Sequence, residues 1–339
     1  MREHPLVLAV DGGGTTSKAA IFDADGSIMR EKTIGPLSCK SSGKDAVASS
    51  IGEMLEFIGE DSTSIEAAVL GLSGLDSPED VSAMVGLLAE SGMCLADSKP
   101  RAHAYGTLCE STWGFPLLLC SDALIPLFAN GLEEGTVVIS GTGSVALRIG
   151  KRGAIERFGG WGYMTSDEGS GCWIGIELMR EALHVADELL SGKVTESKLK
   201  ASSKSLLECA FSAARAQSGS RVSKNASLNQ KATFIREWAT AHDDPKDYAS
   251  LARWVTESSS ASCRGIRERA AAKLAWLASL ACTDDAPVVV LSGGVFSNER
   301  FAALTVKAIR DAVGIDGLRV IVNEAHPAFG AFALARHAL

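Results

Sequence analysis

Short apolar runs that end at glycine-rich turns recur along this chain and predict strands joined by small-residue loops. The first run, Leu6–Val10, meets Asp11 and three glycines, and two further runs, Lys18–Phe22 and Ser27–Thr33, follow after turns. Runs of this length separated by Gly and Asp turns predict three antiparallel strands. This opening differs from a Rossmann fold, because there the glycines lead into a helix.

The same plan returns in the middle of the sequence. An apolar run, Thr136–Ser140, is followed by the turn Gly141–Ser144, a second run, Val145–Ile149, and another turn, Lys151–Gly153. Two copies of one supersecondary unit predict two related halves. We place the boundary before Asp122 and expect an N-terminal domain over residues 1–121 and a C-terminal domain over 122–339.

The remaining periodicity predicts an α/β fold, with helices and buried strands in both halves. In the first half we expect helices over Asp45–Ile58 and from Pro78, and strands over Ala67–Leu70 and Pro116–Cys120. In the second half we expect helices over Ala249–Glu257, Ala261–Leu280, Asn298–Val313 and from Pro327, and strands over Pro287–Leu291 and Leu318–Val322. The Ser-rich stretch Ser191–Lys231 predicts surface helices and loops, or a short disordered segment.

Composition narrows the class of protein. The 339 residues are too many for one core, so two domains are expected. A net charge of -8 gives no electrostatic footprint for nucleic acid or for an anionic membrane. No apolar run reaches the roughly 18 residues of a membrane helix, and no signal-peptide pattern opens the chain. The eight cysteines form no C-x-x-C pair, which favours reduced thiols and a cytoplasmic protein.

The first turn has the chemistry of a phosphate site. Glycines let backbone N–H groups approach phosphate oxygens, and threonine hydroxyls add donors. The candidate phosphate-binding residues are Gly13, Gly14, Thr15 and Thr16, and Asp11 is placed to hold a hydrated Mg²⁺ beside the phosphates. The alternative is a turn that serves packing alone, because a single glycine loop is a weak signal.

Two further turns strengthen this interpretation. A second hairpin turn can bind phosphates, and an apolar strand that runs into bare glycine backbone can accept adenine and ribose. The residues concerned are Gly141, Thr142, Gly143 and Ser144 in the second turn, and Gly293 and Gly294 after the last buried strand run. Three such turns in this order favour a nucleotide site over three unrelated turns.

Three segments resemble the motifs of the sugar kinase, actin and heat-shock ATPase superfamily. LAVDGGGTTSKAAIFD is similar to its first phosphate motif, VVISGTGS to its second and VVVLSGGVFSN to its adenosine motif. The stretch from Gly141 to Gly175, which includes GGWGYMTSDEGSG, resembles N-acetylglucosamine kinases within the BadF/BadG/BcrA/BcrD ATPase group. The resemblance runs from Leu8 to the end of the chain. It implies two ribonuclease-H-like, actin-like ATPase lobes with mixed sheets flanked by helices and an interlobe cleft, with the last helix folding back on the N-terminal lobe.

The resemblance also assigns expected roles. The family's catalytic base is an aspartate after a strand in an S/T-D-A context, which here is Asp122; the alternative for this residue is a helix N-cap. The substrate-binding residues implied are Ser73, Asp122, Gly160, Trp161 and Asp167. For Trp161 and Asp167 we favour sugar contact over a core aromatic or a helix cap. For Trp173 and Glu168 we favour core packing and capping of the following helix.

Two positions depart from the family pattern. The segment Ser38–Lys40 stands where relatives often carry Asn near the sugar, and Val145 stands where eukaryotic members have Asn. The first change bears on which sugar is bound. The second removes one possible polar contact on the nucleotide side, although the use of ATP is still expected.

The leading hypothesis is an ATP- and Mg²⁺-dependent kinase, a homodimer that phosphorylates the 6-OH of N-acetylglucosamine or glucosamine. One alternative is an ATP-driven activator of a radical dehydratase or reductase, which requires an iron–sulfur cluster held by cysteine thiolates. Another is a sensor of sugar or nucleotide without turnover. Neither nucleic acid nor a membrane is expected as a partner.

Overall fold

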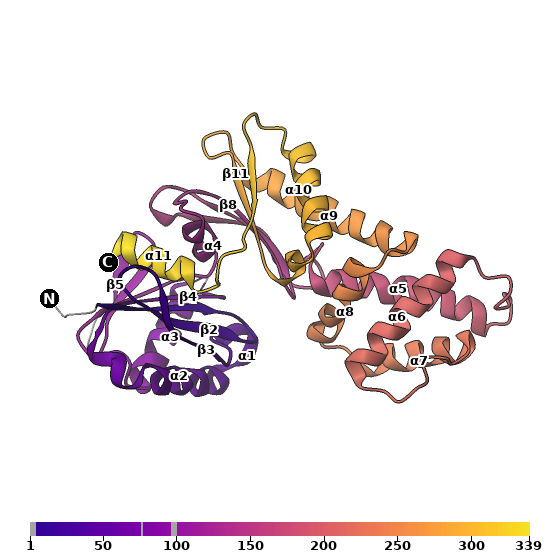
Figure 1. The fold of residues 1–339 in the computed structure, drawn as a ribbon, viewed down its shortest axis with the longest axis horizontal. Helices are drawn as coiled ribbons and strands as arrows, with labels where there is room; N and C mark the ends of the chain where they lie inside the picture. The colour runs from indigo at the N-terminus through magenta and orange to yellow at the C-terminus, as the bar shows by residue number, and fades with distance from the viewer. Residues whose placement is uncertain (1–4, 76, 96–99) are drawn as a thin grey trace. The chain divides into compact units, whose positions relative to one another are not determined.

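The chain folds into two compact units in this computed structural model, which describes residues 5–75, 77–95 and 100–339 (Figure 1). The first unit comprises the chain as far as Gly135 together with Ile149–Ile155 and Asn323–Leu339. The second comprises Thr136–Arg148 and Glu156–Val322. The residues of the candidate boundary at Asp122 lie within the first unit.

A mixed seven-stranded sheet forms the centre of the first unit, counted over the described residues. Its order is β3-β2-β1-β4-β7-β6-β5, in which β1 pairs antiparallel with β2 and parallel with β4. The strands are β1 (Leu6–Gly12), β2 (Ser17–Phe22), β3 (Ile28–Ile34), β4 (Ile65–Leu72), β5 (Arg101–His103), β6 (Gly106–Glu110) and β7 (Pro116–Ser121). The predicted antiparallel opening is therefore confirmed. The short strands β5 and β6 were not predicted, because their residues are mostly polar or partly exposed and show no apolar run.

Helices cover this sheet and bury apolar side chains against it. They are α1 (Cys39–Ser42), α2 (Lys44–Ile58), α3 (Pro78–Glu90), α4 (Leu124–Ala129) and α11 (Phe329–Ala338). The helix α3 begins where its sequence predicts, because Ser77 accepts a hydrogen bond from the Asp80 backbone N–H and Pro78 occupies the first turn. The final helix, α11, packs on β1, β4 and α4, with Phe332 stacked on Phe22 at 4.8 Å between ring centres.

The second unit repeats the strand order of the first. Its sheet runs β10-β9-β8-β11-β12, which corresponds to β3-β2-β1-β4-β7, and β11 pairs parallel with both β8 and β12. The strands are β8 (Gly135–Ser140), β9 (Ser144–Ile149), β10 (Ile155–Gly159), β11 (Val288–Ser292) and β12 (Arg319–Val322). The repeat read from the sequence is thus confirmed, and the fold is α/β with two mixed sheets flanked by helices.

Helices make up most of the second unit. The long helices α9 (Ala261–Ala281) and α10 (Glu299–Val313) pack against each other beside the sheet, and four more gather at the end of the unit (Figure 1). Those four are α5 (Gly171–Leu190), α6 (Ala201–Ser218), α7 (Leu228–Ala241) and α8 (Pro245–Glu257). The Ser-rich stretch therefore forms α6 and the start of α7. One face of α6 reaches the core, where Leu207 and Phe211 are buried.

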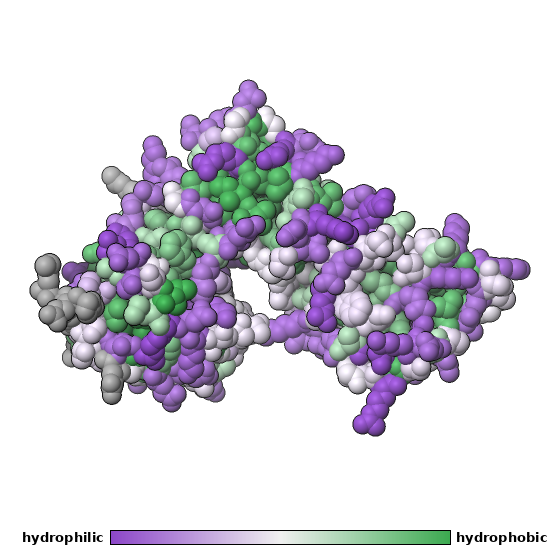
Figure 2. Space-filling model, in the orientation of Figure 1, coloured by the Kyte–Doolittle hydropathy of each residue, from purple (hydrophilic) through white to green (hydrophobic). Residues whose placement is uncertain are grey.

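The surface of the helical end is largely polar on the face shown in Figure 2, whereas apolar residues gather around β11 and α10. Among the residues described, none of the helices combines the length and the apolar character needed to cross a membrane.

Candidate functional site

Three predicted residues meet at the carboxyl ends of neighbouring parallel strands in the first unit. Asp11 on β1 lies opposite Gly71 of β4, whose other neighbour is Cys120 of β7. The backbone N–H of Ser73 donates to the Gly12 carbonyl at 2.8 Å, and that of Asp122 donates to the Leu72 carbonyl at 3.3 Å. Parallel pairing therefore brings Asp11, Ser73 and Asp122 to one edge of the sheet.

The two carboxylates at this edge influence each other. Burial and the nearby charge of Asp122 raise the pKa of Asp11 from its usual value to about 7. A hydrated divalent cation would relieve this repulsion, and Mg²⁺ is commonly held by one or two carboxylates together with water and phosphate oxygens. The residues present fit such an ion. The described residues contain no cluster of three or more metal-ligating side chains, so a cage made of protein alone is not formed.

A buried hydroxyl lies at the same edge. Ser73 Oγ is buried and has no hydrogen-bond partner among the residues that the structure describes. An unpaired buried polar group carries a desolvation cost of about 1–3 kcal/mol. A ligand hydroxyl could remove that cost by pairing with it.

The first glycine turn is held by packing and hydrogen bonds on one side and is exposed to solvent on the other. Gly12 packs closely on the core, because a Cβ carbon there would come within 2.4 Å of Leu72 Cδ2 and this buried side chain would have to shift. The Gly13 carbonyl accepts from the Leu37 backbone N–H at 3.1 Å, and the Gly14 carbonyl accepts from Ser42 Oγ at 2.7 Å. The next two residues, Thr15 and Thr16, are exposed. The turn thus presents hydroxyls and backbone to solvent on a fixed support.

The departure Ser38–Lys40 borders this turn and Ser73. A Cβ carbon on Gly74 would lie 3.0 Å from Ser38 Oγ and 3.4 Å from Lys40 Cδ. The Lys40 ammonium forms an ion pair with Asp80 at 2.8 Å. The Ser38–Lys40 side chains therefore lie beside Ser73, a predicted substrate-binding residue. The charge of Lys40 is paired with that of Asp80.

In the second unit, the second turn and the last glycines share one pocket of about 490 Å³. Gly141, Thr142 and Gly294 line it, together with residues of α8 and the 3₁₀ turn Gly294–Ser297. The pocket brings together the predicted second phosphate turn and part of the predicted adenosine motif. No atom of the described residues would lie within 4 Å of a Cβ carbon on Gly294, whereas a Cβ carbon on Gly293 would lie 2.4 Å from the Ser140 carbonyl oxygen. Gly293 therefore serves strand packing, and Gly294 borders the pocket.

The contribution of α8 to this pocket was missed by sequence reasoning. Its residues Ser250, Arg253, Thr256 and Glu257 border the space, and the only signal was that they share one face of a predicted helix. The hydroxyls of Ser250 and Thr256 donate to carbonyls of their own helix, at 2.6 and 3.1 Å. The exposed side chains of Arg253 and Glu257 are the charged groups that α8 presents here.

Asp167 has the features of a ligand-binding carboxylate. It is buried, at 9% exposure, and has a positive φ of 59°, an uncommon conformation for a residue with a side chain. Burial raises the pKa of Asp167, whereas hydrogen bonds from the Gly162 and Ser144 backbones and the charge of Arg157 oppose that shift. Within the described part of the chain, its Oδ1 atom is buried without a hydrogen-bond partner. An unpaired buried oxygen of this kind is a candidate acceptor for a ligand hydroxyl.

Trp161 projects from the same region and is 71% exposed, so it is not a core aromatic. The Arg157 guanidinium lies 5.4 Å from the centre of its ring, and Arg157 Nη2 donates to the Gly160 carbonyl at 2.6 Å. Val145, the second departure, packs here, because a Cβ carbon on Gly160 would lie 3.0 Å from Val145 Cβ. The stretch offers a flat apolar ring on an arginine-braced loop.

The expected helix caps need correction. The N-cap of α5 is Ser170, whose side chain accepts from the Trp173 backbone N–H, so the expectation that Glu168 caps this helix is wrong. Glu168 lies too far before the helix and forms an ion pair with Lys273 at 2.8 Å instead. The N-cap position of α4 falls on Ala123 rather than Asp122. Trp173 packs partly buried against the core, as expected.

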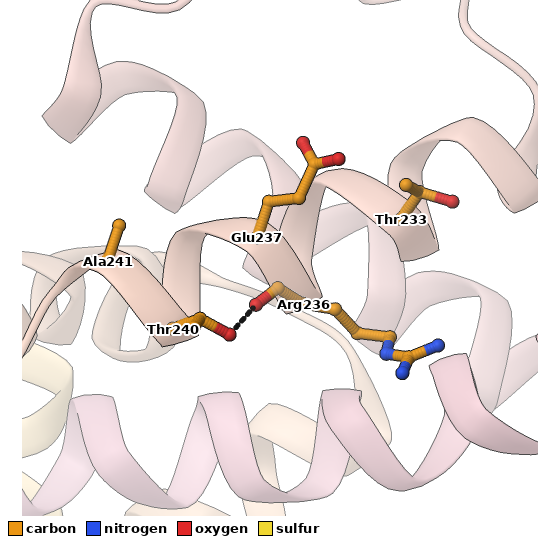
Figure 3. A pocket seen from close by; sticks show the side chains of 5 residues that line it. All are labelled: Thr233, Arg236, Glu237, Thr240 and Ala241. Carbon is orange, nitrogen blue, oxygen red and sulfur yellow. Dashed lines mark hydrogen bonds between the residues drawn. The ribbon is translucent and has the colours of Figure 1, made fainter.

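A separate hollow of about 630 Å³ lies along α7 and contains none of the predicted residues (Figure 3). Thr233, Arg236, Glu237, Thr240 and Ala241 line it. The Thr240 hydroxyl donates to the Arg236 carbonyl at 2.8 Å, and Arg236 forms a long ion pair with Asp187 at 3.6 Å.

Two units with the same strand order, and glycine turns at the ends of their strands, define an actin-like ATPase fold. Residues 8–335 match the BadF/BadG/BcrA/BcrD ATPase family, and the chain belongs to that family. The fold is also that of a Chromobacterium violaceum protein provisionally named N-acetylglucosamine kinase, with a TM-score of 0.61, 22% identity and coverage of 97% of this chain and 98% of that one.

Curated relatives match part of the chain. The N-acetylmuramic acid/N-acetylglucosamine kinase of Clostridium acetobutylicum is 32% identical over 188 residues, which cover 54% of this chain and 55% of the relative. The N-acetyl-D-glucosamine kinase of Dictyostelium discoideum is 25% identical over 197 residues, covering 54% and 56%. The chain therefore spans about half the length of the curated relatives it matches.

Proposed function

We propose that this protein is an ATP-dependent kinase that phosphorylates an amino sugar, N-acetylglucosamine or glucosamine, at its 6-hydroxyl. The names of the curated relatives support the substrate class, and the ATPase family supports the nucleotide. The observation that carries the proposal is the convergence of Asp11 and Asp122 at one edge of the first sheet, where one carboxylate can bind a cation while the other accepts a proton.

In the proposed reaction, Asp122 accepts the proton of the sugar hydroxyl as the hydroxyl oxygen attacks the γ-phosphorus. The bond between that phosphorus and the β,γ-bridging oxygen breaks, and ADP leaves. Asp11 would hold the hydrated Mg²⁺, which supplies charge neutralisation at the phosphates when bound. The turn residues Gly13 to Thr16 would donate to phosphate oxygens from the braced loop.

The second unit carries candidate binding groups of its own. Gly141, Thr142 and Gly143 present turn backbone to phosphate, and the pocket beside Gly294 and α8 has room for a base. Asp167 Oδ1 would accept from a sugar hydroxyl, and Trp161 would offer its exposed ring to the apolar face of a pyranose. In the first unit, Ser73 and the neighbouring Ser38–Lys40 segment would help to select the sugar.

A coupled assay of ADP formation with Mg²⁺ tests this proposal. N-acetylglucosamine, glucosamine, N-acetylmuramic acid, N-acetylmannosamine and glucose form the panel, and we expect turnover that depends on one amino sugar. Asp122→Asn should lower kcat by about 10²- to 10⁴-fold, the usual contribution of a general base. Its melting temperature should be no lower than that of the natural protein, because the substitution removes a charge that repels Asp11. Asp25→Asn, in an exposed turn, is the matched control and should leave kcat unchanged.

Full activity of a folded Asp122→Asn protein would contradict the proposed role of this residue. Iron in the purified protein without sugar-dependent turnover would point to the activator function, and nucleotide binding without turnover would point to a sensor. A cytoplasmic location and a homodimer remain predictions, which fractionation and light scattering would test.

A further inference from the structure

Two buried serines fasten the Asp167 loop to the strands that frame the second turn. Ser144 Oγ donates to the Glu168 carbonyl at 2.9 Å, and Ser140 Oγ donates to the Gly169 carbonyl at 3.0 Å. Ser140 is completely buried and Ser144 is 3% exposed. Each hydroxyl therefore bonds to the loop in a place shielded from water, where a hydrogen bond is costly to lose.

The side-chain donor of Ser144 is directed to this loop. A serine hydroxyl has one proton, and that of Ser144 goes to the Glu168 carbonyl. The Ser144 backbone also faces the Asp167 carboxylate and lowers its pKa. A phosphate oxygen needs a donor, and the Ser144 hydroxyl has already used its one proton. Its role in the second turn is therefore different from that of Thr142, whose side chain is exposed.

The loop needs such support because its backbone is strained. Asp167 is the only non-glycine residue with a positive φ in the part of the chain that the structure describes. A residue in this region of φ and ψ persists only when its surroundings hold it there. Lys273 adds an ion pair to Glu168, and Gly169 fits tightly on α9, where a Cβ carbon would lie 2.7 Å from the Ala270 carbonyl.

The second turn also forms backbone hydrogen bonds with the start of α5, which follows the Asp167 loop in the chain. The Gly171 backbone N–H donates to the Gly141 carbonyl at 2.8 Å, and that of Cys172 donates to the Thr142 carbonyl at 3.2 Å. The turn, the loop and the start of α5 thus form one hydrogen-bonded assembly within the second unit. A shift of the turn must be transmitted to Asp167 through these bonds.

We propose that Ser140 and Ser144 are positioning residues that hold the Asp167 carboxylate in the orientation in which Oδ1 accepts a hydrogen bond from the sugar. Through the same hydrogen bonds, they couple sugar binding at Asp167 to nucleotide binding at the second turn. This inference rests on the proposed kinase function. The proposal gives Ser144 a role in sugar binding, although the position of Ser144 in the second turn suggests a phosphate contact. Because coupling is reciprocal, bound nucleotide should tighten sugar binding and bound sugar should tighten nucleotide binding.

Kinetics of Ser144→Ala and Ser140→Ala test the assignment. We expect each variant to raise the KM for N-acetylglucosamine about tenfold, the equivalent of one buried hydrogen bond. The KM for ATP, measured at sugar concentrations well below the sugar KM, should stay within about twofold. Thr305→Val is the control, because Thr305 is equally buried and its hydroxyl donates to the Phe301 carbonyl of α10 at 2.9 Å. This variant should leave both KM values unchanged.

Calorimetry measures the coupling itself. In the natural protein, the affinity for N-acetylglucosamine should be higher with a non-hydrolysable ATP analogue than without it. The ratio of these two affinities should approach one in the Ser140→Ala/Ser144→Ala double variant. A rise in the KM for ATP with an unchanged sugar KM would make Ser144 a phosphate ligand and overturn the proposal.

Hydrogen exchange gives a readout that does not depend on activity. The segment 162–169 should exchange faster in Ser140→Ala and Ser144→Ala than in the natural protein, and α10 should not. If the natural protein showed no sugar-dependent turnover, the kinase function would fail, and this comparison would still decide whether the serines hold the loop. Unchanged exchange in both variants would overturn the positioning role.

Discussion

The Asp167 carboxylate lies directly against Gly143. A Cβ carbon at Gly143 would come within 2.6 Å of Asp167 Oδ2, whereas one at Gly141 would meet no atom of the described chain within 4 Å. Neither glycine has a positive φ, so their own backbone conformation does not require glycine. The neighbouring aspartate, rather than the turn, excludes a side chain at Gly143.

Gly143→Ala should therefore destabilise the protein, and Gly141→Ala should not. We expect the free energy of unfolding to fall by about 1–3 kcal/mol for Gly143→Ala, the usual cost of overpacking, because the buried carboxylate must move. Urea unfolding without ligands measures both variants. Equal stability of the two would show that Asp167 moves aside freely.

Asp11→Asn should make the protein more stable at alkaline pH while abolishing activity. The folded pKa of Asp11 is raised to about 7, so its carboxyl ionises in the unfolded chain at lower pH than in the folded one. Stability then falls as pH rises from about 4 to about 7, and the full cost persists above that range. The shift of about three units corresponds to at most about 4 kcal/mol.

Thermal unfolding of Asp11→Asn and the natural protein at several pH values, in EDTA, would measure this effect. The two melting temperatures should converge below pH 4, where the carboxyl is protonated in both states, and separate above pH 7. A difference that did not change with pH would contradict the electrostatic cause.

Trp161→Ala should affect sugar binding without affecting stability. The ring is exposed and its cation–π contact with Arg157 is at the surface, so the loss of stability should stay below about 1 kcal/mol. The KM for the sugar should rise about tenfold, because the pyranose loses its apolar platform. Trp276→Ala, which removes another exposed tryptophan of the second unit, is the control and should change neither quantity.

Arg253→Ala should weaken nucleotide binding. Arg253 borders the pocket that Gly141, Thr142 and Gly294 line, and its cation can attract phosphates or stack on a base. We expect the KM for ATP to rise about tenfold with an unchanged sugar KM. Arg236→Ala, in the hollow along α7 (Figure 3), should leave both values unchanged; an equal effect of the two substitutions would mean that the pocket has no special role.

Much of the fold follows from local sequence. The runs Leu6–Val10 and Thr136–Ser140 predicted β1 and β8 because a strand with both faces covered must be apolar, and the glycine turns marked where those strands end. The repeated strand order was predictable for the same reason, since both copies retain the pattern. The strands β5 and β6 escaped prediction because they are short and partly exposed, and such strands carry little periodicity.

The sequence by itself determined which chemical groups are present and at which strand ends: Asp11 after one apolar run, Asp122 after another, and Asp167 after a glycine-rich stretch. Tertiary structure alone decided which of these groups meet. Parallel pairing through β4 brought Asp11 to Asp122, packing of α8 completed the pocket beside Gly294, and the choice of hydrogen-bond acceptor turned Ser144 toward the Asp167 loop. The physical reason is that periodicity is a local property of a chain, whereas pairing, burial and the partner of a hydroxyl proton depend on residues distant in sequence.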